Sequence, residues 1–297
     1  MSRIECHYLF TRWRKSGNKF PPRLSLSKQL KPVLSVKIQP LVCGRQTMSH
    51  RRVLPLDFST LWLLLVVAAI SPSTAWSYEE TKVTDGGTIE GKVVFRGTMP
   101  SPRKVIPTQD QEVCGGPRDE PRLVLGSDNT VPGAVVFLKG VEKGKAFEKP
   151  KKPPVVDNAK CKFEPELQVV PAGTEILILN SDPVLHNTHG YLLTDSRRGR
   201  TVFNQALPQK GQQVKSTLKS PGVVDVACDV HGWMQGWIVV ADNPYFAVTE
   251  KNGTFAIKDI PPGKYTLATF QPYVGVRETP VTVESKKTNN VNVELKK

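Results

Sequence analysis

The feature that most constrains the fold is a series of short apolar runs separated by turn residues. Each run is rich in Val, Ile, Thr and aromatic residues and is bounded by Gly, Pro, Asn or Asp, and helical periods are few. Many short strands at close spacing are typical of β-sandwiches and barrels. The sequence therefore predicts an all-β fold. The runs span residues 88–97, 133–140, 166–180, 222–230, 236–242, 253–260, 263–270 and 290–296.

Residues 1–77 hold most of the positive charge of the chain. They carry twelve Lys and Arg against two acidic residues, which is +10 of the total of +14. The rest of the chain carries only +4, so the basic composition does not predict a nucleic-acid partner.

This leader contains the pattern of an export signal. Arg51 and Arg52 precede the apolar run Leu61–Ile70, and small residues follow it. The run is short for a membrane-spanning helix, which needs about 20 residues. We expect cleavage after Ala75 or Ser77 and a periplasmic or secreted protein without a stable membrane span. A retained anchor is the alternative.

The segment before the signal has its own interpretation. A signal of ordinary length would begin at Met48. Residues 1–47 are therefore expected to be an over-extended gene start or, alternatively, an organelle-targeting presequence.

Three cysteines, Cys114, Cys161 and Cys228, remain after the leader. An odd number in an oxidising compartment leaves one thiol unpaired. Cys228 lies in a motif with other metal-ligand types, so a Cys114–Cys161 disulfide is the natural pairing. Separate buried thiols are the alternative.

Two separated segments resemble the halves of one module. The stretches "GGTIEGKVVFRGTMP" with "VPGAVVFLKG", and "AVTEKNGTFAIKDIPPGKYTLATFQP", are similar to the front and back of a carboxypeptidase-regulatory-like (transthyretin-like) β-sandwich. Asn252 and Gly253 suit a tight turn, and the Pro261–Gly263 stretch ends one strand and begins the next. This resemblance implies a discontinuous domain of residues 78–150 with 244–297, and a second β domain, residues 156–243, inserted in it.

All three histidines after the leader lie in two short stretches. His186 and His189 are in "NSDPVLHNTHGYLL", and His231 is in "ACDVHGWMQGWIVV" together with Cys228 and Met234. Cys, His and Met, each three residues after the last, can wrap one metal ion from a single loop, and a distant His can close the site. Two imidazoles, a thiolate and a weak axial thioether make the electron-transfer copper site.

The segment "CDVHGWMQGWIVV" with the upstream "HNTH" resembles the cupredoxins, in particular their amicyanin-like and plastocyanin-like members. The resemblance covers roughly residues 156–243 and implies a Greek-key sandwich or barrel that holds one type 1 copper ion. It implies that the ligands are His186, Cys228, His231 and Met234.

The same resemblance assigns supporting roles. Asn187 matches the residue whose backbone amide hydrogen-bonds the Cys sulfur. His189 is expected to support the site or simply to be hydrogen-bonded elsewhere, with an extra metal ligand as the alternative. His231 would present its ring edge to solvent as the electron route. Trp233 is expected to pack in the core or the loop, with an electron-entry surface beside the site as the alternative. Gly232 departs from the amicyanin pattern, which has Pro after the ligand His, and this predicts a looser loop.

The arginines of "SRRGR", Arg197, Arg198 and Arg200, are expected in a solvated loop, with docking of an acidic redox partner as the alternative. The cupredoxin-like segment and the split regulatory-like module together also resemble exported bacterial proteins of the "methylamine utilization" type.

The expected function is that of an exported blue-copper one-electron carrier with an unidentified redox protein partner. No Ser-His-Asp order, paired catalytic carboxylates, phosphate loop or covalent haem motif points to an enzyme. A copper carrier, storage or sensor protein is one alternative. A structural envelope module with zinc or no metal is another, which Met234 disfavours because a thioether is a poor zinc ligand.

Overall fold

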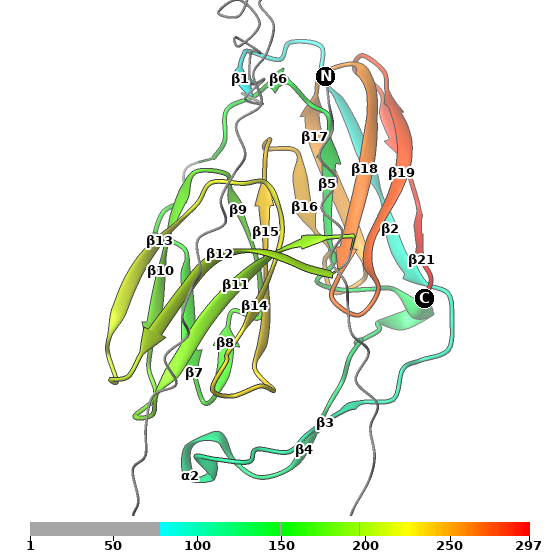
Figure 1. Ribbon diagram of the computed structural model, residues 1–297. Helices are drawn as coiled ribbons and strands as arrows, with labels where there is room; N and C mark the ends of the chain where they lie inside the picture. Colours follow the sequence, from blue (N-terminus) through cyan, green and yellow to red (C-terminus); the bar gives the residue numbers. More distant parts are fainter. Residues whose placement is uncertain (1–77, 149, 196) are drawn as a thin grey trace, which may run out of the picture. The chain divides into compact units, whose positions relative to one another are not determined.

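The computed structural model describes residues 78–148, 150–195 and 197–297 (Figure 1). The predicted export signal, its cleavage site and the 1–77 leader lie outside the described residues. Regular structure in the described part is almost entirely β, so the predicted all-β fold is confirmed. No helix in this part is long and apolar enough to cross a membrane.

Residues 155–241 form two sheets that pack face to face. Their shared core includes Ile176 and Ile178 from one sheet and Val224, Val226 and Ile238 from the other. Both sheets contain one parallel pair in an otherwise antiparallel arrangement. The four-stranded sheet has the order β13 (Gln213–Leu218), β10 (Thr174–Asn180), β7 (Val155–Ala159) and β8 (Lys162–Glu164), and the five-stranded sheet has the order β12 (Arg197–Leu207), β11 (His186–Thr194), β14 (Gly222–Ala227), β15 (Gln235–Ala241) and β9 (Leu167–Pro171).

Strands before and after this region share a second pair of sheets. Their common core includes Ile89, Leu138, Phe255 and Leu267. One sheet has the order β16 (Phe246–Val248), β5 (Val135–Lys139), β18 (Gly263–Gln271) and β19 (Gly275–Val283), and the other has β17 (Thr254–Ile260), β2 (Gly87–Phe95) and β20 (Thr288–Asn290), with β21 (Val293–Leu295) also on β2. The described residues fall into one compact unit, and the division into two domains stays a prediction.

A third apolar cluster lies between the five-stranded sheet and the sheet that contains β5 and β18. Val223 and Val239 come from the first sheet, and Val135 and Phe270 come from the second. Because strand residues alternate between faces, both sheets are buried on both sides. This explains why "GVVDVA" and "AVVF" are nearly continuous apolar runs.

Residues 103–120 lie outside these sheets and form an extended excursion (Figure 1). This segment, called the 103–120 segment below, contains β3 (Arg103–Val105), β4 (Arg118–Glu120) and the single helical turn α2 (Gln111–Cys114). Strands β3 and β4 pair only with each other. The remaining short elements are β1 (Glu79–Glu80), which pairs with β6 (Lys143–Gly144), and the 3-10 turn η1 (Ser127–Asn129).

Candidate metal centre

His186 opens strand β11 and points into the core of the 155–241 sandwich. It is fully buried, as is Thr188 two residues later, whereas Asn187 and His189 lie on the other face of the strand. The alternation of a β-strand thus separates the two histidines of "HNTH". Only His186 can contribute to a buried site on this face.

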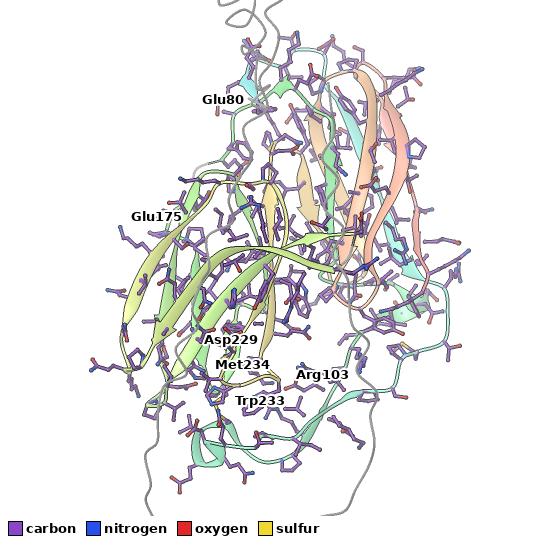
Figure 2. The ribbon with its side chains drawn as sticks, viewed as in Figure 1. Glu80, Arg103, Glu175, Asp229, Trp233 and Met234 are labelled. Atoms are coloured by element: carbon purple, nitrogen blue, oxygen red, sulfur yellow. A yellow bond between two sulfur atoms is a disulfide. The ribbon has the colours of Figure 1, made fainter. Side chains whose placement is uncertain are left out.

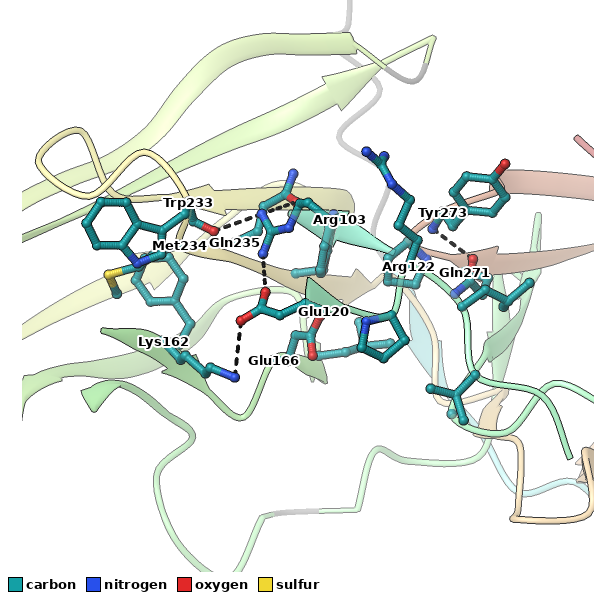
Figure 3. Close-up of a pocket in the computed structure, with 18 of the residues that line it drawn as sticks. Arg103, Glu120, Arg122, Lys162, Glu166, Trp233, Met234, Gln235, Gln271 and Tyr273 are labelled. Carbon is teal, nitrogen blue, oxygen red and sulfur yellow. Dashed lines mark hydrogen bonds and ion pairs between the residues drawn. The ribbon is translucent and has the colours of Figure 1, made fainter. Parts of the chain in front are cut away.

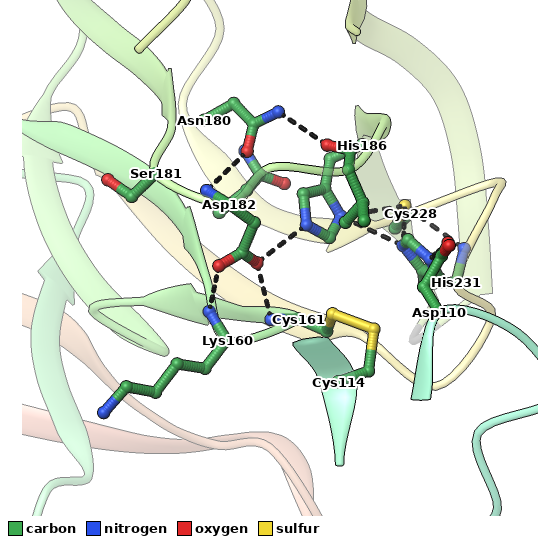
Figure 4. Close-up of polar contacts among 12 residues, drawn as sticks. Asp110, Cys114, Lys160, Cys161, Asn180, Ser181, Asp182, His186, Cys228 and His231 are labelled. Carbon is green, nitrogen blue, oxygen red and sulfur yellow. Dashed lines mark hydrogen bonds and ion pairs between the residues drawn. A yellow bond between two sulfur atoms is a disulfide. The ribbon is translucent and has the colours of Figure 1, made fainter. Parts of the chain in front are cut away.

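Asp182 fixes the orientation of the His186 ring. Its Oδ2 lies 2.9 Å from Nε2 of His186 (Figure 4). The same carboxylate accepts the backbone N–H groups of Lys160 and Cys161 at 2.8 Å each. These two residues have positive φ and form the two-residue turn between β7 and β8, so the carboxylate is anchored to a tight hairpin.

This contact decides which nitrogen of His186 is free. A carboxylate can only accept, so Nε2 carries the proton and Nδ1 keeps a lone pair. Burial lowers the pKa of His186, which Asp182 opposes only in part. The ring is therefore held as neutral imidazole, the form that binds a metal ion.

Cys228 follows the end of β14 and is buried. Its Sγ accepts the backbone N–H of Asn187 at 3.4 Å and that of His231 at 3.3 Å. Two N–H donors stabilise a thiolate. Among the cysteines that the structure describes, only Cys228 is free.

Three donor atoms converge at one point. Nδ1 of His186 lies 3.0 Å from Nδ1 of His231, and Sγ of Cys228 lies 4.0 Å and 3.8 Å from these two nitrogens. With metal bonds of about 2.0 Å to nitrogen and 2.3 Å to sulfur, ligands spread around one ion stand about 3 to 4 Å apart. The donor set thus fits one metal ion of the kind that accepts imidazole and thiolate.

Met234 lies in the same apolar cluster as Cys228 and is buried. Its backbone N–H is bonded to the carbonyl of His231 at 2.9 Å, which closes the ligand loop as a turn. Its side chain lies next to Trp233 (Figures 2 and 3). The axial role of Met234 stays a prediction.

His189 is satisfied away from the site. Its Nδ1 lies 3.0 Å from Oδ2 of Asp229, its Nε2 lies 2.9 Å from Oγ1 of Thr201, and its ring stacks on Tyr191. Asn187, by contrast, touches the site both through its N–H on Cys228 and through its side-chain oxygen, which accepts the N–H of Asp229 at 3.3 Å.

Cys114 and Cys161 form a disulfide, and Cys161 is fully buried. The Cys161 sulfur, one ring nitrogen of His186 and one ring nitrogen of His231 all lie within 4.8 Å of one another. As a disulfide sulfur it offers no thiolate, so Cys228 remains the sulfur ligand of choice. The bridge nevertheless places α2 directly beside the centre.

The expectation that the His231 ring edge faces solvent is wrong for this chain. His231 is fully buried, and its Nε2 lies 2.9 Å from Oδ2 of Asp110 in the 103–120 segment. Sequence reasoning missed Asp110 and Asp182. A polar residue four positions before His186 was a weak local signal for Asp182, but nothing local indicated Asp110.

The arginines of "SRRGR" also differ from expectation. They lie in strand β12 rather than in a loop, and all three are exposed. Arg198 is bound to Asp225 of β14, with Nε 2.8 Å from Oδ2. Arg198 is thus committed to a partner within the chain.

Trp233 lies between the centre and a polar cavity. Its ring is centred 5.0 Å from that of His231, and it lines a cavity of about 460 Å³ together with Arg103, Glu120 and Lys162 (Figure 3). The Trp233 indole N–H has no hydrogen-bond partner among the described residues.

Comparisons with known proteins give partial likenesses. A family model described as polysaccharide lyase family 4, domain II, matches residues 216–291. This match covers about a quarter of the chain and runs from β13 to β20, across both pairs of sheets. It describes a different domain from the expected carboxypeptidase-regulatory-like module, which stays a prediction. The search of curated proteins found no match.

Solved structures similar to part of the chain are cupredoxins. Amicyanin from Paracoccus versutus is 21% identical, with 32% of this chain and 86% of that chain covered and a TM-score of 0.27. A purple cupredoxin from Nitrosopumilus maritimus is 22% identical, with 30% and 99% covered and a TM-score of 0.26. A copper-containing nitrite reductase from Thermus scotoductus is 24% identical, with a TM-score of 0.27; the match covers 33% of this chain and 24% of the reductase.

Proposed function

We propose that the chain is a type 1 copper protein that carries one electron at a time. One observation carries this proposal: Nδ1 of His186, Nδ1 of His231 and Sγ of Cys228 meet within 3.0 to 4.0 Å in a buried pocket. Two imidazoles and one thiolate are donors that suit such a centre. Bound copper would supply a one-electron couple, and we propose that Met234 would be its fourth ligand.

The residues around the centre favour electron transfer over substrate chemistry. A catalytic metal site requires an open ligand position that substrate can reach. Here both imidazoles are fully buried, so no such position faces solvent. The ligands are also held in place before any ion arrives, by Asp182 on His186 and by two N–H donors on Cys228. Rigid ligands suit an ion that changes oxidation state with little movement of its surroundings.

The copper carrier or storage alternative would need an ion that exchanges easily. A buried centre with anchored ligands disfavours that use. A zinc or metal-free structural module stays the second alternative.

We propose that residues 78–150 with 244–297 form a supporting β-sandwich around the inserted 156–243 domain, because β5 pairs with β16 and with β18. Export and an unidentified redox protein partner remain part of this proposal.

The test is the absorption and EPR spectrum of the full chain loaded with Cu(II). We expect an intense visible band from thiolate to copper, lost in Cys228→Ser and in His186→Asn. His189→Asn is the matched control, because it removes an imidazole three residues away on the opposite face of β11, and its band should persist. Reversible reduction with slow loss of copper to a chelator would support the electron carrier.

No thiolate band in the wild-type protein would overturn the copper proposal. Tight zinc binding in its place would favour the structural alternative. A normal band with rapid loss of copper to the chelator would favour the copper-storage or copper-carrier alternative.

A further inference from the structure

The 103–120 segment contacts the ligand loop, residues 228–234, at three points. Nε2 of Gln109 donates to the carbonyl of Val230 at 2.8 Å. The Asp110 carboxylate binds His231, and Nη1 of Arg103 donates to the carbonyl of Trp233 at 2.8 Å. A stretch outside both sandwiches therefore follows the loop from residue 230 to residue 233.

Asp110 adopts an unusual conformation to make its contact. It precedes the helical turn α2, at the N-cap position, with φ 50° and ψ 34°. Asp at this position ordinarily caps the helix with its side chain, but here the side chain makes no cap hydrogen bond. The carboxylate instead contacts His231, which lies 121 residues away in the sequence. A left-handed, non-capping Asp that contacts a buried imidazole points to a role at that imidazole.

The backbone that carries Asp110 is tied down on both sides. Cys114, four residues later, is bridged to Cys161. Nη1 of Arg118 donates to the carbonyl of Cys114 at 3.1 Å, and Glu120 binds both Arg118 and Arg103. The Asp110 carboxylate is thus presented to His231 by a fixed scaffold rather than by a loose loop.

We propose that Asp110 is a positioning residue of the metal centre, and this inference rests on the proposed copper function. By accepting from Nε2–H of His231, it sets the tautomer that leaves Nδ1 free and aims it at the metal. It does for His231 what Asp182 does for His186. The 103–120 segment thereby becomes a working part of the site, although it lies outside the five-stranded sheet, in which His186 begins β11 and Cys228 follows β14.

The carboxylate also biases the oxidation state. An ionised acceptor on the far nitrogen makes the imidazole a stronger donor, and the negative charge favours the more positive ion. Asp110 therefore stabilises Cu(II) more than Cu(I) and lowers the reduction potential. Loss of an outer partner of this kind typically weakens metal binding about 10- to 100-fold.

The experiment compares Asp110→Asn and Asp110→Ala with the wild-type full chain. The Asn variant keeps an acceptor of the same shape but removes the charge, whereas the Ala variant removes both. Asp119→Asn is the matched control, because Asp119 lies in the same segment but pairs with exposed Lys104. The readouts are Cu(II) affinity by competition with a chelator, the reduction potential, and thermal unfolding of the metal-free protein.

We expect Cu(II) affinity to fall about tenfold in Asp110→Asn and further in Asp110→Ala. If Cu(I) affinity is unchanged, a tenfold loss raises the potential by about 59 mV. The control should keep both values. Metal-free Asp110→Asn should unfold like wild type, which separates positioning from folding.

Wild-type affinity and potential in both Asp110 variants, with the visible band intact, would overturn the inference while leaving the copper proposal standing. An equal change in Asp119→Asn would also overturn it, because the effect would then be general charge. Absence of the band in the wild-type protein would instead be the failure of the copper proposal itself.

Discussion

At the scale of single residues, Glu120 is the anchor of the 103–120 segment. Its carboxylate binds Arg103 at 2.5 Å, Arg118 at 2.8 Å and Lys162 at 3.2 Å. Burial alone would raise the pKa of Glu120, but the hydrogen bonds from these three cations outweigh it and lower the pKa from 4.5 to about 2. One carboxylate thus joins β3, β4 and the 155–241 sandwich at β8.

This pKa predicts an acid-sensitive contribution to stability. Because the folded pKa is below the ordinary value, the stabilisation is present above about pH 4.5 and is lost as the pH falls toward 2. After solvent screening we expect about 1 to 2 kcal/mol of unfolding free energy. Urea unfolding at pH 6 and pH 3 should show a smaller difference for Glu120→Gln than for wild type. Glu175→Gln, which removes an exposed partner of Lys215, should behave like wild type, and an equal pH effect in all three proteins would contradict the prediction.

At the scale of elements, regular apolar alternation was the signal that the sequence offered. It predicted the strands near residues 88–97 and 263–270, which the structure has as β2 and β18. It missed β11 and β12, because "HNTHGYLLT" and "RRGRTVFNQAL" are polar on their exposed face and are stabilised by contacts such as that of Arg198 with Asp225. Side-chain pairs between strands are not visible in a local pattern.

The candidate site likewise contains residues that a local pattern predicts and residues that it does not. His186, Cys228 and His231 could be predicted because ligand type and loop spacing are local properties, and the structure brings them together. Asp110 could not, because its partner His231 is 121 residues away and its position depends on how the 103–120 segment is tied to the 155–241 sandwich. Chain segments without apolar periodicity are where contacts with distant partners escape sequence reasoning.

At the scale of the whole molecule, the cluster between the two doubly buried sheets couples the two sandwiches. Phe270 is 1% exposed there, against Val223 and Val239 of the five-stranded sheet. Neither sheet can lose this cover without exposing apolar surface to water. The two sandwiches therefore stabilise each other.

Phe270→Ala should destabilise the protein by about 3 to 5 kcal/mol, because it leaves a cavity in that cluster. Calorimetry of the wild-type protein should show one transition, moved to lower temperature in the variant. Val248→Ala is the control on the same sheet, since Val248 is 51% exposed and its loss should be nearly neutral. Two wild-type transitions, of which only one moves in Phe270→Ala, would mean that the sandwiches unfold independently.

The disulfide that ties α2 to Cys161 of the 155–241 sandwich also has a consequence for the order of maturation. Both imidazoles are fully buried, and the disulfide tethers the segment whose Asp110 contacts His231. We expect that an incoming ion has to displace this segment. We therefore expect that metallation precedes oxidation of this pair in the history of each molecule. Copper uptake, followed through the visible band, should be faster in a Cys114→Ser, Cys161→Ser double variant than in the oxidised wild type. Equal rates would mean that ions enter by another path; faster uptake would make the bridge the step that seals the loaded protein.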